Sequence, residues 1–301
     1  MIQKQTSTAL KKFLIRTTSP AMRRQMLAVW EQAQDFTSYW RKSLALEGAL
    51  PDFIIIGAQK CGTTYLYDQI VQHPGVTGAR TKEIHFFDAY YRRGLGWYRA
   101  FFPRKRAGGA AGDFLTGEAS PSYLFHPHTA GRARQAVPQA KLIAILRNPV
   151  DRAYSHYHHE VRLGYEALSF EDALAQENRR VAGELERMLA DDSYHSHHYM
   201  HFAYKKKGAY VDQVRHWRQF FSADQMLVLR SDDLYRDTAA TVSRVYAFLG
   251  LPDWQPAARE KHKVFAYPKM APQTRQQLLE YFAPHNQRLY DYLGEDYGWN
   301  S

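Results

Sequence analysis

The fold of this chain is indicated by residues 51–73, which read PDFIIIGAQKCGTTYLYDQIVQH. The β-branched run over 53–56 is typical of a strand that is buried on both faces. The loop Gly57–Thr64 follows it, and residues 63–73 have the apolar spacing of a helix. A buried strand, a glycine-containing loop and a helix in this order predict the opening unit of an α/β fold.

Two further segments repeat the strand-then-helix pattern. The apolar runs 141–146 and 226–229 are followed by helical patterns over about 150–162 and 237–249. Strands that alternate with helices favour a parallel sheet covered on both faces. We therefore predict an α/β fold, a P-loop-like parallel sheet flanked by helices, that forms one domain over residues 51–301.

The N-terminal segment, residues 1–50, is rich in positive charge. It has eight basic and three acidic residues, in a chain whose 40 Lys and Arg and 30 Asp and Glu give a net charge of +10. The sequence predicts a basic helical arm, packed on the core or on a partner, or lying on a membrane surface or an acidic polymer. The net charge favours anionic partners without choosing among them.

Cellular location is constrained by what the sequence lacks. Cys61 is the one cysteine, so an intramolecular disulfide is impossible and an oxidising compartment gains no support. The first thirty residues lack the apolar core, about 7–15 residues long, of a signal peptide. No apolar run reaches the ~18 residues of a transmembrane helix. We predict a cytoplasmic protein and leave its oligomeric state open.

The loop after the first strand has the features of an anion site. Its two glycines have P-loop spacing, but Thr63 stands where a nucleotide triphosphatase has lysine, and Lys60 lies inside the loop instead. Inward-facing N–H groups and a helix N-terminus favour an anion there. The residues expected to bind it are Gln59, Lys60, Cys61, Gly62, Thr63 and Thr64. The displaced lysine argues against ATP hydrolysis, and no magnesium site is evident.

The segment 51–64 resembles the opening motif of sulfotransferases that use 3′-phosphoadenosine 5′-phosphosulfate (PAPS). The resemblance is to the heparan sulfate and related glycosaminoglycan branch and its bacterial relatives. It runs from about residue 51 to the end and is strongest in 57–64, 82–88, 146–157 and 263–268. It implies PAPS as co-substrate and 3′-phosphoadenosine 5′-phosphate (PAP) as product. It also implies in-line sulfuryl transfer without a metal, with Lys60 at the leaving oxygen.

The acceptor side is expected at residues 82–88, KEIHFFD. Glu83 and His85 are two apart, so in an extended segment after a strand they share one face. An acceptor hydroxyl must lose its proton, and a carboxylate or imidazole within ~3 Å can take it. The resemblance implies Glu83 as general base and His85 as a positioning or sulfonate-stabilising group. Because the small-molecule branch uses histidine, His85 stays the alternative base. Lys82 is a candidate contact for an acidic substrate.

A second phosphate site is predicted after the strand 141–146. Arg147 ends this strand, where open α/β sheets bind ligands, and Ser155 follows in the next helix. An arginine fork with a hydroxyl suits a phosphate dianion. The stretch 147–155 resembles the family's 3′-phosphate motif, which implies that Arg147 and Ser155 hold that phosphate. Lys263 and Tyr267 match the loop that closes on the cofactor in this branch.

Three further side chains are candidate acceptor contacts: Tyr123, His198 and Lys205. Tyr123 lies in a stretch that resembles a substrate-side segment of the family. His198 belongs to the run HSHHYMH over 195–201, which favours a polar helix face or cleft lining over a metal site, because no carboxylate or cysteine adjoins it. Lys205 begins a run of three lysines, a solvated run or one that steers a polyanion.

The residues together predict a PAPS-dependent O-sulfotransferase acting on a carbohydrate hydroxyl. The charge and the resemblance favour an acidic, glycosaminoglycan-like or capsular polysaccharide as acceptor. The alternatives are a sulfotransferase for a small alcohol, glycolipid or peptide tyrosine, a P-loop small-molecule kinase, and a non-catalytic polyanion-binding module. A nucleic-acid partner is not expected, because no recognisable nucleic-acid motif is present.

Overall fold

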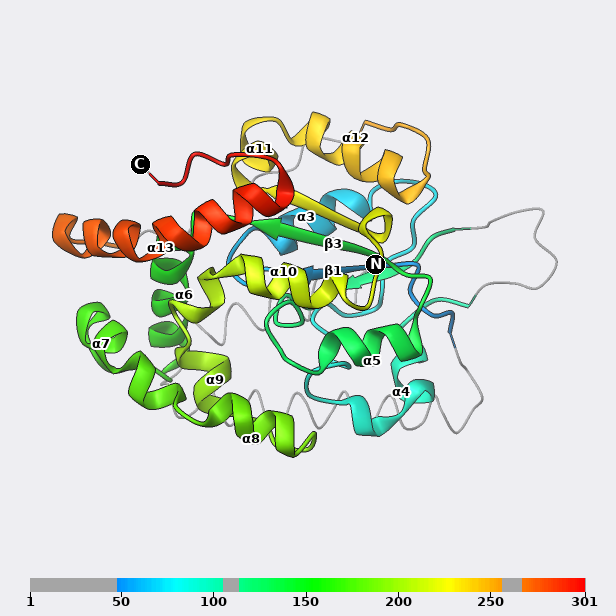
Figure 1. Cartoon of the computed structure of the whole chain (residues 1–301). Helices are drawn as coiled ribbons and strands as arrows, with labels where there is room; N and C mark the ends of the chain where they lie inside the picture. Colours follow the sequence, from blue (N-terminus) through cyan, green and yellow to red (C-terminus); the bar gives the residue numbers. More distant parts are fainter. Residues whose placement is uncertain (1–47, 105–113, 256–266, 301) are drawn as a thin grey trace.

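The computed structural model describes residues 48–104, 114–255 and 267–300 (Figure 1). The predicted N-terminal arm over residues 1–50 lies almost wholly outside these ranges and stays a prediction. Lys263, a predicted cofactor contact, also lies outside the described residues. No helix within the described ranges is long and apolar enough to cross a membrane.

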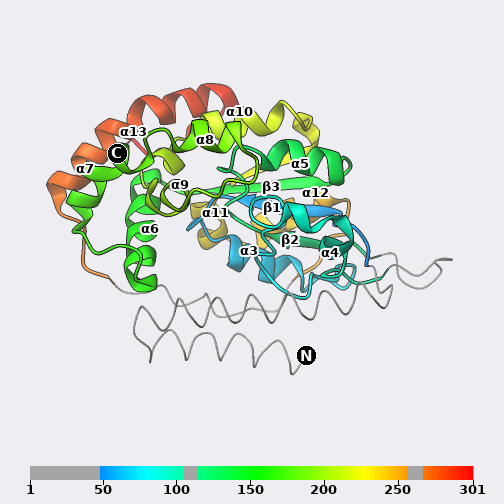
Figure 2. The same ribbon diagram turned by 90° about the horizontal axis from the view of Figure 1, so that it is seen from below.

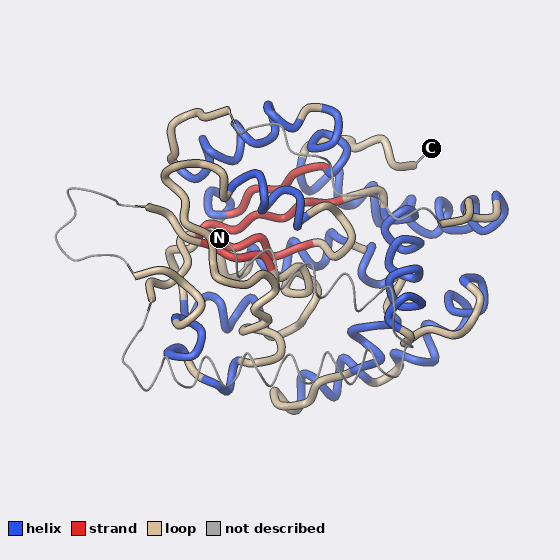
Figure 3. The backbone as a smooth tube through the Cα atoms, turned by 180° about the vertical axis from the view of Figure 1, so that it is seen from behind, coloured by secondary structure: helices blue, strands red, loops and turns tan. Residues whose placement is uncertain are grey.

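A parallel sheet forms the centre of the molecule, with strands in the order β2-β1-β3-β4. The strands are β1 (Phe53–Gly57), β2 (Gly117–Ala119), β3 (Lys141–Leu146) and β4 (Met226–Arg230). The α/β prediction and three of these strands are confirmed. Strand β2 was not predicted, because three residues are too short to show a pattern. Figure 3 shows the strands side by side with helices around them.

Helices cover both faces of the sheet, as expected for parallel strands that are apolar on both sides. They are α3 (Thr63–Ile70), α4 (Leu95–Arg99), α5 (Thr129–Ala136), α6 (Pro149–Leu163), α7 (Phe170–Val181), α8 (Glu184–Ala190), α9 (His197–Phe202), α10 (Tyr210–Arg218), α11 (Ser231–Arg236), α12 (Thr238–Leu249) and α13 (Pro272–Leu293). Short 3₁₀ turns are η1 (Tyr91–Arg93), η2 (Lys206–Gly208) and η3 (Ala223–Gln225). Figure 2 shows α5, α10 and α13 on one face and α3 on the other.

The direction of the chain connections changes beside β1. The connection after β1 leads to β2 on one side, and the chain then passes to β3 on the other side of β1. Open α/β sheets bind ligands where connections diverge in this way. The loop after β1 and Arg147 after β3 therefore lie at one edge. Helix α6 starts there, with the Asn148 side chain accepting a hydrogen bond from the Val150 N–H at 3.0 Å.

Candidate functional site

The loop Gly57–Thr64, called the phosphate loop below after its predicted role, joins β1 to α3 in the predicted strand–loop–helix order. Gly62 caps α3 with φ 94°, a conformation in which a larger residue would be strained, and a Cβ there would lie a tight 3.1 Å from the Tyr235 hydroxyl. Lys60 also has a left-handed φ, 70°. Thr63 is buried and Thr64 is exposed. The free N–H groups at the start of α3 make this turn suited to an anion.

The Lys60 ammonium lies in a crowded positive environment. Burial lowers its pKa to about 8, and Arg162 and Arg147 act in the same direction, while Glu83 and Glu160 oppose them. Positive groups from the phosphate loop, from the end of β3 and from α6 therefore converge here. An anion bound between them is the natural way to offset their mutual repulsion.

Cys61 does not present its side chain to the loop's mouth. The thiol is fully buried, and its Sγ lies 3.7 Å from the Tyr210 hydroxyl. Burial raises the pKa of the Cys61 thiol, so the reactive thiolate is disfavoured. The Cys61 side chain packs in the core, so it does not make the cofactor contact predicted for this residue.

The predicted acceptor segment is not extended at Glu83 and His85. The prediction that an extended backbone puts these two side chains on one face was therefore wrong. Glu83 and His85 have φ of 55° and 56°, both left-handed, and no strand precedes them within the described residues 76–88. The backbone is held by the Glu83 N–H, which donates to Ala119 O at 3.0 Å, and by the His85 N–H, which donates to Ser120 Oγ at 3.2 Å. The two side chains still meet, with Glu83 Oε2 3.8 Å from His85 Nε2.

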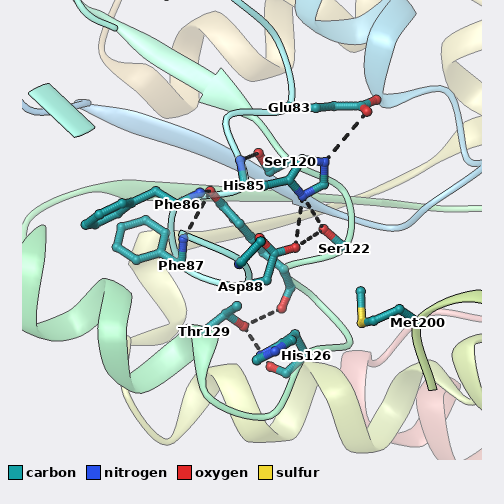
Figure 4. Close-up of polar contacts among 12 residues, drawn as sticks. Glu83, His85, Phe86, Phe87, Asp88, Ser120, Ser122, His126, Thr129 and Met200 are labelled. Carbon is teal, nitrogen blue, oxygen red and sulfur yellow. Dashed lines mark hydrogen bonds and ion pairs between the residues drawn. The ribbon is translucent and has the colours of Figure 1, made fainter. Parts of the chain in front are cut away.

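His85 lies between two carboxylates (Figure 4). Its Nδ1 is 3.0 Å from Asp88 Oδ2, and Ser122 Oγ donates to that same Asp88 oxygen at 2.5 Å. Burial alone would lower the pKa of the His85 imidazole, but Asp88 and Glu83 outweigh it and hold the pKa well above its ordinary value. Burial likewise opposes ionisation of Asp88, yet His85 keeps the pKa of that carboxyl low. His85 is therefore an imidazolium near neutral pH.

Replacing Asp88 by Asn tests this charge assignment through stability. We expect Asp88→Asn to lower the free energy of unfolding by about 2 kcal/mol, less than for a fully buried pair because 33% of the His85 side chain is exposed. Because the folded-state pKa of Asp88 is depressed, Asp88 stabilises the fold at pH values above its unfolded-state pKa. Because the folded-state pKa of His85 is raised, His85 stabilises the fold at pH values below its unfolded-state pKa. The difference in the free energy of unfolding between wild type and Asp88→Asn should be largest between about pH 4 and 6.5.

Urea unfolding of wild type and Asp88→Asn at pH 6 and pH 9 measures this difference. It should shrink at alkaline pH, as the pH rises through the folded-state pKa of His85. An equal difference at both pH values would contradict an Asp88–imidazolium pair.

Tyr123 has no exposed surface, so it does not line a cleft as predicted. Its hydroxyl donates to buried Glu118 at 3.1 Å and accepts from the Phe86 N–H at 2.8 Å. Ser120 Oγ also donates to Glu118, at 2.7 Å. Tyr123 thus fixes the backbone that follows His85 and acts on the site through position.

The other predicted acceptor contacts are spread over the surface. Lys82 pairs with Asp68 of α3, with 34% of its side chain exposed. His198 Nδ1 lies 3.1 Å from Arg180 O at the end of α7, and Lys205 Nζ lies over the Tyr281 ring of α13 at 5.3 Å. Lys82 adjoins Glu83 in the chain but pairs with Asp68, and the contacts of His198 and Lys205 are with α7 and α13. As acceptor contacts the three stay predictions.

The predicted 3′-phosphate residues flank the start of α6. Arg147 follows β3, and its carbonyl accepts from the Tyr210 hydroxyl at 2.9 Å. Ser155 lies on α6 and is partly exposed. Tyr267 stacks on His158 of the same helix, with ring centroids 4.4 Å apart. The structure thus gathers Arg147, Ser155 and Tyr267 around one helix.

His159 and Arg162 were not predicted as site residues. They follow Ser155 on α6 by four and seven residues, which places all three on one helix face. Arg162 Nη2 donates to His159 Nδ1 at 2.8 Å. Burial lowers the pKa of His159 to about 3, with a further contribution from Lys60. A neutral imidazole with Nδ1 occupied has Nε2–H left as a donor. The spacing Ser155-x₃-His159 could have signalled this face.

One histidine of α9 and one of α6 meet a carboxylate that the sequence did not reveal. His201 Nδ1 lies 2.9 Å from Glu160 Oε2, and His156 Nε2 lies 3.0 Å from Glu160 Oε1. Within the described ranges no group of three or more His, Cys, Asp or Glu side chains is arranged to hold a metal ion. Glu160 instead links α6 to α9 beside Lys60.

Comparison with known proteins identifies the family to which this sequence is similar. The family described as the sulfotransferase domain matches residues 50–290. Heparan sulfate glucosamine 3-O-sulfotransferase 3B1 of Mus musculus is 30% identical over 275 residues, covering 83% of this chain and 65% of that protein. Membrane-associated sulfotransferase kil1 of Dictyostelium discoideum is 26% identical over 318 residues, covering 84% and 67%. The chain spans about two thirds of the length of these relatives.

A solved structure gives the same result for the fold. The sulfotransferase from Alicyclobacillus acidocaldarius superposes with a TM-score of 0.65 at 33% identity. The match covers 84% of this chain and 100% of that one. The described sheet and helices therefore have the arrangement of that sulfotransferase over the whole length of its chain.

Proposed function

Since this chain belongs to the sulfotransferase domain family, as its sequence predicted, we propose that it moves a sulfuryl group from PAPS to a carbohydrate hydroxyl. One observation carries the proposal: a half-exposed carboxylate, Glu83, lies beside an imidazolium and acts electrostatically on the lysine of a phosphate loop. A base on the acceptor side and cations on the donor side are what in-line transfer of an anionic group requires.

The charge of His85 supports Glu83 as the general base. An imidazolium cannot accept a proton, whereas 49% of the Glu83 side chain is exposed and reachable by an acceptor hydroxyl. His85 then holds Glu83 by charge and can donate to a sulfonate oxygen. Lys60 and the N–H groups at the start of α3 stabilise charge on the leaving phosphate oxygen. This assignment needs no proton transfer through Asp88, which only keeps His85 charged.

The donor is proposed on the fit of the residues to its two anionic ends. The loop with Lys60 suits the 5′-phosphosulfate, and Arg147 with Ser155 suits the 3′-phosphate that distinguishes PAPS from ATP. We expect Arg147→Gln to weaken PAP binding about tenfold or more, while AMP, which lacks the 3′-phosphate, binds as to wild type. Isothermal titration calorimetry measures both affinities.

Arg179 on the exposed face of α7 supplies the matched control for this test. Arg179→Gln removes the same charge and should leave PAP affinity unchanged. Equal losses for PAP and AMP in Arg147→Gln would place Arg147 elsewhere than at the 3′-phosphate.

An acidic polysaccharide is the proposed acceptor. The net charge of +10 and the names of the relatives, which act on heparan sulfate, support this class. The test is a labelled-PAPS assay on unsulfated polysaccharides, with mass spectrometry of the product. Transfer to small alcohols, glycolipids or peptide tyrosine alone would replace the acceptor while keeping the reaction.

Two other functions are distinguished from the proposed one by binding and turnover measurements. A small-molecule kinase would bind ATP with Mg²⁺ better than PAP, and a polyanion-binding module would bind polysaccharide without turning over PAPS. The cytoplasmic location and a peripheral membrane contact through residues 1–50 stay predictions.

A further inference from the structure

Lys207 is a buried lysine that the proposed reaction does not use. It belongs to η2, at the end of a run of lysines whose middle member, Lys206, is exposed. Only 4% of the Lys207 surface is exposed. Its ammonium forms no ion pair with a carboxylate in the described part of the chain. A buried, unpaired ammonium is costly, so its presence calls for a role.

The contacts of Lys207 lead to the phosphate loop. Its Nζ donates to Gln59 Oε1 at 3.0 Å and to the carbonyl of Met200 in α9. It also lies over the Phe125 ring, at 5.5 Å from the centroid. Lys207 therefore joins the phosphate loop to the segment that connects α9 with α10, 148 residues away in sequence.

The chemistry of these contacts fixes the Gln59 amide. An ammonium only donates hydrogen bonds, so in its charged form Lys207 holds the amide by its oxygen. With Oε1 on Lys207, the Gln59 NH₂ group is the end left for an anion. The reverse orientation would set two donors against each other behind the loop.

Two buried basic side chains lie close together in this region. Lys207 and fully buried Arg152 line one small cavity together with Ala58 and Gln59 of the loop. Burial lowers the pKa of Lys207 to about 7, with Arg152 acting in the same direction, while Glu160, Asp88 and Glu177 oppose them. An anion on the other side of the loop would stabilise the charged form of Lys207, and the charged form would stabilise the anion.

We propose that Lys207 is a positioning residue of the donor site, which turns the Gln59 amide so that its NH₂ group meets the phosphosulfate. This rests on the proposed function of the loop. Lys207 acts through Gln59, so it affects donor binding without touching the donor.

The test is a double-mutant cycle on PAP affinity with Lys207→Met and Gln59→Met, measured by calorimetry. Each single variant should weaken PAP binding about tenfold or more. The double variant should be no weaker than either single one, because both remove the same contact. Effects that multiply would overturn the proposal.

Stability separates positioning from a merely structural role. Methionine keeps the length of the lysine chain and removes the cost of a buried charge. It also leaves Gln59 Oε1 and the Met200 carbonyl without this donor, so the two effects oppose each other and Lys207→Met should change the melting temperature only slightly. The control Lys206→Met changes the exposed neighbour and should alter neither melting temperature nor PAP affinity. A large drop in melting temperature in Lys207→Met would make Lys207 structural and overturn the proposal.

If Lys207→Met does not fold, a second variant tests the contact between Lys207 and Gln59. Gln59→Glu gives the ammonium a carboxylate partner and removes the NH₂ donors. We expect a higher melting temperature and PAP binding weakened about tenfold or more. An unchanged melting temperature would contradict the Lys207–Gln59 contact. Wild-type protein that fails to bind PAP would refute the proposed function instead, while PAP binding that is insensitive to these variants would refute only the role of Lys207.

Discussion

Glu83→Gln should abolish most turnover while leaving the donor site intact. We expect kcat to fall by about 10²–10⁴-fold, the usual contribution of a general base, because glutamine cannot take the acceptor proton. PAP affinity should stay within about twofold, since Glu83 acts on the acceptor side of the loop. Labelled PAPS turnover and calorimetry with PAP measure the two quantities.

Glu186→Gln on the exposed face of α8 is the matched control and should have wild-type kcat. Normal turnover in Glu83→Gln would reject Glu83 as the base. A parallel His85→Gln variant then distinguishes the alternative. A loss confined to His85→Gln would assign the base to His85 and contradict its imidazolium state.

Lys60→Met should have the second largest effect. We expect kcat to fall by about 10²–10³-fold, the range measured when a preorganised group that stabilises developing charge is removed. The pKa of Lys60, about 8 in the free protein, adds a pH signature. Wild-type kcat/KM should fall as the pH rises above about 8, because Lys60 loses its proton there.

Lys60→Arg provides the control for charge. Arginine stays protonated throughout this range, so the decline near pH 8 should disappear even if the overall rate is lower. A pH profile from 6 to 10 on wild type and Lys60→Arg checks this. If the same decline persists in Lys60→Arg, another group controls it and the assignment of Lys60 fails.

Local pattern was enough to predict the part of the site that lies at strand ends. The β-branched run of β1 and the glycines after it specify a strand and a turn through nearest-neighbour sterics, and Arg147 was placed by the end of β3. Such features depend on a few consecutive residues. The family resemblance added Glu83, and the structure keeps Glu83 close to His85 through a different backbone conformation.

The rest of the site depends on contacts between distant segments. Ser122 reaches Asp88 from 34 residues away, and Lys207 reaches Gln59 from 148. Lys207 stood in the sequence as one of three lysines, with nothing to distinguish it from its solvated neighbour. Tyr123 was expected in a cleft and is buried on Glu118 instead, because burial depends on what packs above a residue.

By itself the sequence therefore determined the parallel α/β sheet, the glycine-containing turn after β1 and the position of the arginine after β3, since hydrophobic period and glycine position act locally. Only the tertiary structure decided which charges meet. It made His85 an imidazolium between two carboxylates and placed the Lys207 ammonium behind the loop. Charge state follows from burial and from neighbours across the fold, and neither can be read from residues adjacent in sequence.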